Sequence, residues 1–115
     1  MGITVEDAQK WANALRSGKY KQTTGELQSQ YGYCCLGVAC KIFIPDDKIK
    51  KDVYGFIEGG FPKHQLSSPM WLININEDLD DKINYSFSSL NDGHYFSFDE
   101  IADIIELVYI HKALD

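Results

Sequence analysis

A polar segment at residues 19–25 carries side chains that suit recognition of an anion. These seven residues hold two ammonium groups, an aromatic ring, an amide and two hydroxyls, and Arg16 stands one helical turn earlier. Lysine and arginine pair with phosphate, a tyrosine ring stacks on a base, and amides and hydroxyls fix a ligand's orientation. The candidate ligand-binding residues here are Arg16, Lys19, Tyr20, Lys21, Gln22, Thr23 and Thr24.

A second candidate lies near the other end of the chain. Asn91-Asp92-Gly93 is the strongest turn signal in the sequence, because all three residue types favour tight turns. If the two ends of the protein meet, Asp92 would order a lysine or arginine of the polar segment. Asn91 and Asp92 are therefore added to the candidate ligand-binding residues.

The same polar segment has a structural alternative. Its residues would then form a turn, its lysines would lay their stems along the core, and Tyr20 would pack on Trp11. The residues alone leave both interpretations open.

Charge limits the kinds of partner. The 115 residues carry 11 basic and 17 acidic side chains, a formal net charge of −6. General binding to nucleic acid is disfavoured, because it needs an extended basic face that releases counterions. The only charged residues between 8 and 25 are basic, so a small anionic, nucleotide-like ligand is compatible with this segment.

The second part of the chain suggests a different partner. Residues 71–115 hold 2 basic and 10 acidic side chains, whereas residues 1–70 hold 9 and 7. An acidic surface of this kind would engage a basic patch on another protein, with mimicry of DNA as the extreme case. The residues to test are Glu77, Asp78, Asp80 and Asp81. A second copy of the chain is a further possible partner, although no heptad pattern supports it.

Three cysteines raise the alternative of an enzyme. Cys34 or Cys35 would act as a nucleophile with His64, His94 or His111 as its base. These thiols open an apolar segment, where a free cysteine behaves as a small hydrophobic residue. No Cys-x-x-Cys pair occurs and the histidines are scattered, so we predict no metal, no cofactor and no catalytic residue.

Hydrophobic periodicity and capping signals predict three main helices. The first covers residues 5–16, with Thr4 as its cap and Gly18 closing its end. A buried helix over residues 34–43 ends before Pro45. A capping box, with a serine at 97 and a glutamate at 100, starts a helix that we expect over residues 98–113.

The remaining segments are predicted to be short or irregular. We expect a loop or hairpin at residues 19–27, a turn into a short strand at 31–33, a short strand at 53–57, one helical turn at 69–72 that buries Met70 or Trp71, and an exposed acidic loop at 77–81. The predicted fold is α+β: a small single domain over residues 1–115, with N-terminal, central and C-terminal helices around a short β-hairpin or small antiparallel sheet.

Composition supports a folded chain away from the membrane. The sequence is 44% hydrophobic and 24% charged, which is not the composition of a disordered protein. No apolar run approaches the roughly 20 residues that span a bilayer, and no signal-peptide pattern opens the chain. We therefore expect a cytoplasmic protein that does not bind membranes.

Motifs at both ends of the chain resemble those of a group of small, mostly uncharacterised proteins encoded by tailed bacteriophages and prophages. The N-terminal motif comprises Trp11, residues 14–22, Gly25, Leu27 and residues 33–38. Its C-terminal counterpart is Leu-Asn-Asp at 90–92 followed by the Ser-Phe-capped segment 97–103. Together they cover about half of the chain. The resemblance implies a role in the contest between phage and host, inside the bacterial cytoplasm, and it carries over no catalytic site.

Overall fold

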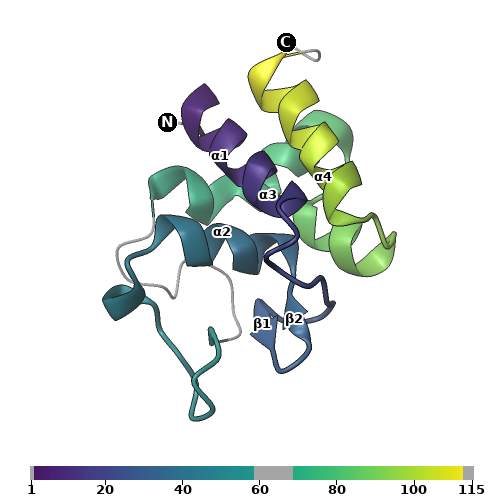
Figure 1. The fold of residues 1–115 in the computed structure, drawn as a ribbon. Coiled ribbons are helices and arrows are strands. Elements are labelled where there is room, and N and C mark those ends of the chain that lie inside the picture. The colour runs from purple at the N-terminus through teal and green to yellow at the C-terminus, as the bar shows by residue number, and fades with distance from the viewer. Residues whose placement is uncertain (1, 59–68, 113–115) are drawn as a thin grey trace.

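The first and last long helices of the chain pack side by side (Figure 1). The computed structural model describes residues 2–58 and 69–112. Its elements, in chain order, are α1 (Val5–Arg16), β1 (Gln28–Ser29), β2 (Gly32–Tyr33), α2 (Cys35–Phe43), η1 (Asp46–Lys48), α3 (Met70–Ile83), η3 (Ser89–Gly93), α4 (Phe98–Ile105) and η4 (Glu106–Ile110). The predicted α+β class is confirmed, because the described residues combine these helices with one two-stranded antiparallel sheet.

Both predicted N-terminal helices form where the sequence places them. In α1, the Thr4 hydroxyl accepts a hydrogen bond from the Asp7 amide at 3.0 Å, and Gly18 follows the helix with a φ of +78°. Residue Cys34 precedes α2, and its Sγ accepts from the Gly37 amide at 3.4 Å. The helix ends at Phe43, before Pro45, as predicted.

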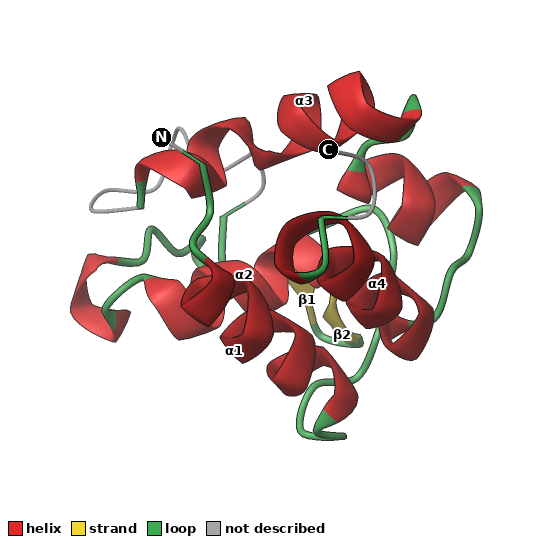
Figure 2. Cartoon of the chain, turned by 90° about the horizontal axis from the view of Figure 1, so that it is seen from above, coloured by secondary structure: helices red, strands yellow, loops and turns green. Residues whose placement is uncertain are grey.

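The core lies between the helices and is centred on aromatic rings. Trp11 is fully buried, and its ring centroid lies 4.8 Å from that of Phe87 and 6.0 Å from that of Trp71. The indole N–H of Trp11 donates to the Cys35 carbonyl at 3.0 Å, which ties α1 to the start of α2. Seen from above, α3 extends along one side of the molecule while α1 and α4 lie together on another (Figure 2).

Two predictions for the middle of the chain need correction because α3 is much longer than expected. Residues 70–72 are helical, as predicted, but they begin a helix of 14 residues, with Pro69 at its N-cap position, and do not form an isolated turn. The predicted loop at the acidic run 77–81 is wrong, since these residues belong to the same helix. Its buried residues are Trp71, Leu72, Ile75 and Leu79. Their spacing forms one apolar face, and the acidic residues occupy the remaining positions. Of the two candidates for burial, Trp71 is buried and Met70 is 70% exposed.

The predicted strand at residues 53–57 is also wrong. This segment is a turn in which the Asp52 carboxylate accepts hydrogen bonds from the amides of Tyr54 and Phe56, at 2.9 and 3.1 Å. An isolated bridge between Lys51 and Ile57 is the one ladder contact within residues 51–58. Local side-chain bonding of this kind competes with strand formation.

The predicted C-terminal helix begins where expected, but its second half differs from a regular α-helix. Ser97 and Glu100 form the predicted capping box at the start of α4. After Ile105 the helix continues with π-helical hydrogen bonding as far as Ile110, and the expected end at 113 lies outside the described residues. The Asn91-Asp92-Gly93 segment closes the helical element η3 and is not a hairpin turn. None of the described helices is long and apolar enough to cross a bilayer.

Candidate functional site

The two ends of the chain do meet, through the side-chain amides of Gln22, which is partly buried, and Asn91, which is buried. The Gln22 side-chain amide donates to Asn91 Oδ1 and to the Phe96 carbonyl, both at 2.8 Å, and its oxygen accepts from the Phe98 amide at 3.1 Å. In turn, Asn91 accepts from the Cys35 amide at 3.3 Å and donates to the Thr23 carbonyl at 2.9 Å. We call these two side chains and their partners the Asn91 cluster.

The two amides of the Asn91 cluster have no N–H group left for an anionic ligand. Asn91 is only 1% exposed, and its second amide proton goes to the Asp92 carboxylate at 2.7 Å. The two N–H groups and the oxygen of the Gln22 side chain are all hydrogen-bonded to the protein. The cluster therefore ties the polar segment to the starts of α2 and α4, and two of the candidate ligand-binding residues have structural roles.

Arg16 is also engaged by the protein itself. Its guanidinium donates to both oxygens of Glu106, at 2.7 and 2.8 Å, and to the Asp103 carboxylate. The hydrogen bonds from Arg16 lower the pKa of Glu106 to about 2. Because two carboxylates neutralise it, Arg16 joins α1 to α4 and η4 and is poorly placed to bind an anion.

The backbone around Tyr33 fixes the next part of the polar segment. The Tyr33 amide donates to the Lys21 carbonyl and the Thr23 amide donates to the Tyr33 carbonyl, both at 2.8 Å. Residues 21–23 therefore lie alongside β2, with the Lys21 side chain and Thr24 exposed to solvent. The Tyr20 ring packs edge-on against Tyr33, with centroids 5.3 Å apart, and not on Trp11 as the structural alternative expected.

An open hollow of about 300 Å³ lies beside the end of α1. It is lined by Lys10, Asn13, Ala14, Ser17, Lys19, Tyr20 and Ile42, and we call it the basic hollow. Two of its residues, Lys19 and Tyr20, were candidates from the sequence. The α1 residues were missed, although their spacing at 10, 13, 14 and 17 places them on one helical face.

The described lining of the basic hollow includes two ammonium groups and no carboxylate. Among the described residues neither Lys10 nor Lys19 forms an ion pair, and the Lys10 ammonium lies 5.6 Å from the centre of the Phe43 ring. The amide of Asn13 accepts from Gln9 at 3.0 Å, which leaves its own N–H groups for other partners. Positive charge, an amide donor and an aromatic ring thus face one surface depression.

The three cysteines lack the properties of reactive thiols. All are free and buried, and burial raises the pKa of Cys34 to about 11 and that of Cys40 to about 12. Burial also raises the pKa of Cys35, whose thiol lies 3.7 Å from the Phe87 carbonyl. A nucleophilic cysteine needs the opposite shift.

No base for a thiol is found among the described histidines. His94 packs edge-on against Tyr85 at 4.9 Å, and neither it nor His111 forms a hydrogen bond with a cysteine. The third candidate, His64, lies outside the described residues. Within those residues, no group of His, Cys, Asp and Glu side chains is arranged to hold a metal ion.

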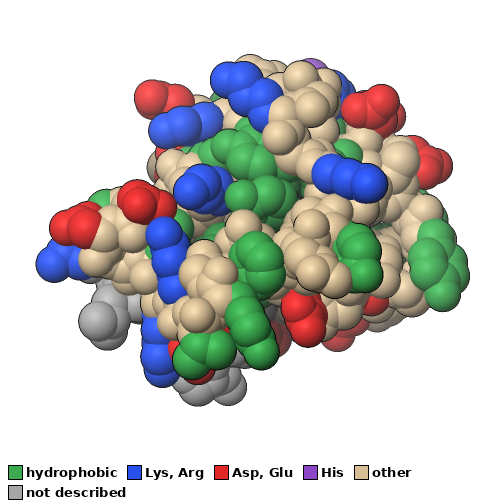
Figure 3. Space-filling view, turned by 60° about the horizontal axis from the view of Figure 1, so that its bottom comes forward, with side chains coloured by type: hydrophobic (Ala, Val, Ile, Leu, Met, Phe, Trp, Pro, Cys, Tyr) green, Lys and Arg blue, Asp and Glu red, His purple; other side chains and the backbone are tan. Residues whose placement is uncertain are grey.

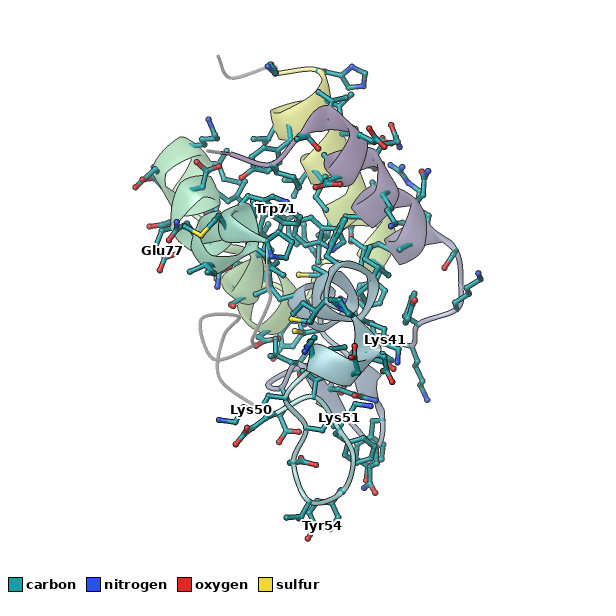
Figure 4. All side chains as sticks on the ribbon, turned by 90° about the vertical axis from the view of Figure 1, so that its left-hand side faces the viewer. Lys41, Lys50, Lys51, Tyr54, Trp71 and Glu77 are labelled. Carbon is teal, nitrogen blue, oxygen red and sulfur yellow. The ribbon has the colours of Figure 1, made fainter. Side chains whose placement is uncertain are left out.

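The acidic residues of α3 divide between solvent and the fold. Glu77, Asp80 and Asp81 are exposed and share one helical face, since they are three and four positions apart. Figure 4 shows Glu77 directed outward from α3, whereas Trp71 points towards the interior. In contrast, the Asp78 carboxylate accepts a hydrogen bond from the Tyr109 hydroxyl at 2.7 Å.

Comparison with known proteins gives one match. Neither the curated proteins nor the solved structures contain a match to this chain. A family model described as "Domain of unknown function (DUF8296)" matches residues 4–109, which include α1, the basic hollow and the Asn91 cluster. Because this match spans most of the sequence, the chain belongs to the family described as Domain of unknown function (DUF8296).

Proposed function

We propose that the protein is a non-enzymatic binding module that captures a small anionic, nucleotide-like ligand in the basic hollow. The observation that carries this proposal is the pair of lysines, Lys10 and Lys19, which face a hollow without a lining carboxylate. Elsewhere the basic residue Arg16 is held by Glu106 and Asp103. In the basic hollow, by contrast, two positive charges lie together and remain open to a ligand.

The chemistry of the hollow suits a phosphate attached to a ring. Lys10 and Lys19 would bind phosphate oxygens as point charges, and the Asn13 amide would donate a further hydrogen bond. Tyr20 offers an aromatic edge or face to a base, and its packing on Tyr33 holds the ring in place. A volume of about 300 Å³ is at the small end of ligand sites and suits a mononucleotide.

The proposed biological role is sequestration of a nucleotide-derived immune signal in the cytoplasm of an infected bacterium. The resemblance to phage and prophage proteins supports this setting. Sequestration needs affinity and no bond-breaking group, and the buried, protonated thiols fit a protein that does not react with its ligand. The ligand would be depleted by binding alone.

Thermal stability tests the proposal directly. The melting temperature is measured in the presence of mono-, di- and cyclic nucleotides and ADP-ribose derivatives, at low and at physiological salt. A ligand that binds only the folded state raises the melting temperature of the protein. We expect one class of compound to raise it and to be recovered intact. Lys10→Gln and Lys19→Gln should each abolish the shift, whereas Lys48→Gln, which changes a lysine outside the hollow, should not.

The outcomes separate the alternatives. Equal shifts in wild type and both hollow variants would contradict the proposed site. A compound recovered in altered form would favour the enzyme interpretation, and Cys34→Ser and Cys35→Ser would then show whether a thiol is responsible. No shift with any compound would contradict nucleotide capture.

A second candidate function rests on the exposed carboxylates of α3. Three of them share one face of a regular helix, so their spacing is fixed as it would not be in a loop. We propose as the alternative that this face engages a basic patch on a host protein, such as an enzyme that handles nucleic acid. Binding should weaken sharply with salt and be lost in the Glu77→Gln, Asp80→Asn, Asp81→Asn variant, but not in Asp47→Asn, Asp99→Asn. Salt-insensitive binding would contradict it.

A further inference from the structure

A second hollow, whose lining is acidic where that of the basic hollow is basic, lies where the β1–β2 turn meets the turn at residues 52–56. It measures about 400 Å³, and its lining includes three aromatic residues, Tyr31, Tyr54 and Phe56, and two carboxylates, Glu26 and Asp52. Among the residues that the structure describes, no lysine or arginine lines it. We call it the aromatic hollow.

The aromatic rings of this hollow are unusually open to solvent. Tyr31 is 65% exposed and Tyr54 is 80% exposed, whereas the rings of the core are buried. Figure 4 shows Tyr54 at the far end of its loop, beyond Lys50 and Lys51. Apolar and aromatic side chains gather in separate groups on this end of the molecule, with charged side chains between them (Figure 3). Water-exposed rings keep their π faces available to a ligand.

Hydrogen bonds hold the two turns that carry these rings. The Ile57 amide donates to Gln28 Oε1 at 2.9 Å, and the Ile57 side chain is buried in the core. Within the second turn, the Asp52 amide donates to the Phe56 carbonyl at 2.8 Å. The Tyr31 amide donates to the Ser29 hydroxyl at 3.1 Å. The β1–β2 hairpin and the 52–56 turn are thereby joined, so the hollow has a defined frame.

The charge in the aromatic hollow is negative, and no lysine within residues 2–58 and 69–112 forms an ion pair with its two carboxylates. Lys51 pairs with Asp46, and Lys50 pairs with Glu58, at 3.4 and 3.3 Å. Asp52 uses Oδ1 for its own turn, and no hydrogen bond to Oδ2 is formed within the described residues. Glu26 is exposed and forms no ion pair there. An anion would be repelled from this hollow, and a cation would be attracted.

We infer that the aromatic hollow binds a small alkylammonium cation, with the rings of Tyr31, Tyr54 and Phe56 against its methyl groups and the carboxylates of Glu26 and Asp52 balancing its charge. Aromatic faces attract a cation through the ring quadrupole, and this attraction suits quaternary ammonium groups, which have a large apolar surface. A bare ammonium is more strongly hydrated and gains less from aromatic contact. This site is independent of the proposed nucleotide capture.

Choline and its uncharged isostere 3,3-dimethyl-1-butanol test the inference. Each is titrated into the 15N-labelled protein in the millimolar range, with sodium chloride holding ionic strength constant. We expect choline to shift the amide resonances of residues 26–31 and 52–56, and the isostere to leave them unchanged. Equal shifts with both compounds would overturn a cation site, and so would no shift with either.

Variants of Tyr54 that remove or keep its aromatic ring test whether the cation binds in the aromatic hollow. Tyr54→Leu should weaken choline binding about fivefold, because it removes an aromatic face, whereas Tyr54→Phe should change it less than about twofold. Asp52→Asn keeps the oxygen that holds the turn and should weaken binding by a similar factor. Unchanged affinity in both Tyr54→Leu and Asp52→Asn would overturn the assignment to this hollow.

A further arm identifies the source of the cation. N-acetyl-trimethyllysine methylamide carries the same charged group as choline on a protein-like backbone. Tighter binding of this compound than of choline would place the cation on a methylated side chain of a partner. Weaker or equal binding would support a free small molecule.

Discussion

Gln22 and Tyr20 are two residues apart, yet they belong to regions that use polar groups in opposite ways. In the Asn91 cluster, every amide group of Gln22 and Asn91 is bonded to the protein. In the basic hollow, Lys10 and Lys19 carry charges that no described residue balances. A polar side chain therefore indicates a binding site only when the fold does not already use its hydrogen-bonding groups.

The largest effect on stability is expected for Gly37→Ala, which tests how closely α2 packs against the segment before β1. A Cβ at Gly37 would lie 1.7 Å from the Leu27 carbonyl oxygen, so the segment before β1 would have to move away from α2. We expect a loss of about 3 kcal/mol or more in the free energy of unfolding, measured by urea denaturation. The control is Gly93→Ala, because nothing lies within 4 Å of its added Cβ. Similar losses in both variants would mean that α2 and the hairpin are not closely packed.

Asn91→Ala tests the cluster itself. The change leaves the Cys35 amide and the Thr23 carbonyl without their side-chain partner and removes one acceptor of Gln22. We expect the free energy of unfolding to fall by about 2–3 kcal/mol, because buried polar groups lose hydrogen bonds. Asn74→Ala, at an exposed position of α3, should cost less than about 0.5 kcal/mol. Equal effects would contradict the structural role of the Asn91 cluster.

The sequence predicts the elements whose signals are local. The Thr4 cap, the box formed by Ser97 and Glu100, and the helix end before Pro45 each depend on a few neighbouring residues. The α3 helix was misjudged because its acidic residues 77–81 dominate the pattern, whereas burial is decided by Leu72, Ile75 and Leu79 on the other face. A hydrophobic face interrupted by charge still forms a helix when packing supports it.

The candidate site is only partly predictable for a related reason. Lys19 and Tyr20 line the basic hollow, as the local inventory suggested. The roles of Gln22 and Asn91 depend on a contact across 69 residues of sequence, and no local pattern predicts such a contact. From the sequence, Asp92 was expected to order a basic residue only if the two ends met, and in the structure they meet through the amides of Gln22 and Asn91.

Acid titration tests whether the ion pair between Arg16 and Glu106 stabilises the fold, in contrast to the lysines of the basic hollow, which form no ion pair with any residue that the structure describes. Because the folded-state pKa of Glu106 is about 2, against an ordinary value of 4.5, its ion pair stabilises the fold fully above pH 4.5. That contribution declines as the pH falls from 4.5 towards 2. Glu106→Gln should therefore cost about 1 kcal/mol at neutral pH, and the difference from wild type should shrink across this acid range.

Urea denaturation at several pH values measures this difference. Asp99→Asn is the control, because Asp99 is exposed and takes part in no ion pair among the described residues. A difference between wild type and Glu106→Gln that stays constant from neutral to acid pH would contradict a working Arg16–Glu106 pair. Arg16 would then have to be reconsidered as a ligand contact.

The smallest effect on stability is expected at the basic hollow, and it decides whether the comparison holds. Lys10→Gln and Lys19→Gln keep most of each side chain's length and remove only a charge that no described carboxylate balances. Each should change the free energy of unfolding by less than about 0.5 kcal/mol, measured by urea denaturation without ligand. A loss above about 1 kcal/mol would show that these charges stabilise the fold, as Arg16 does. If the variants keep the stability of the wild type but lose ligand binding, the two lysines contact the ligand and do not stabilise the fold.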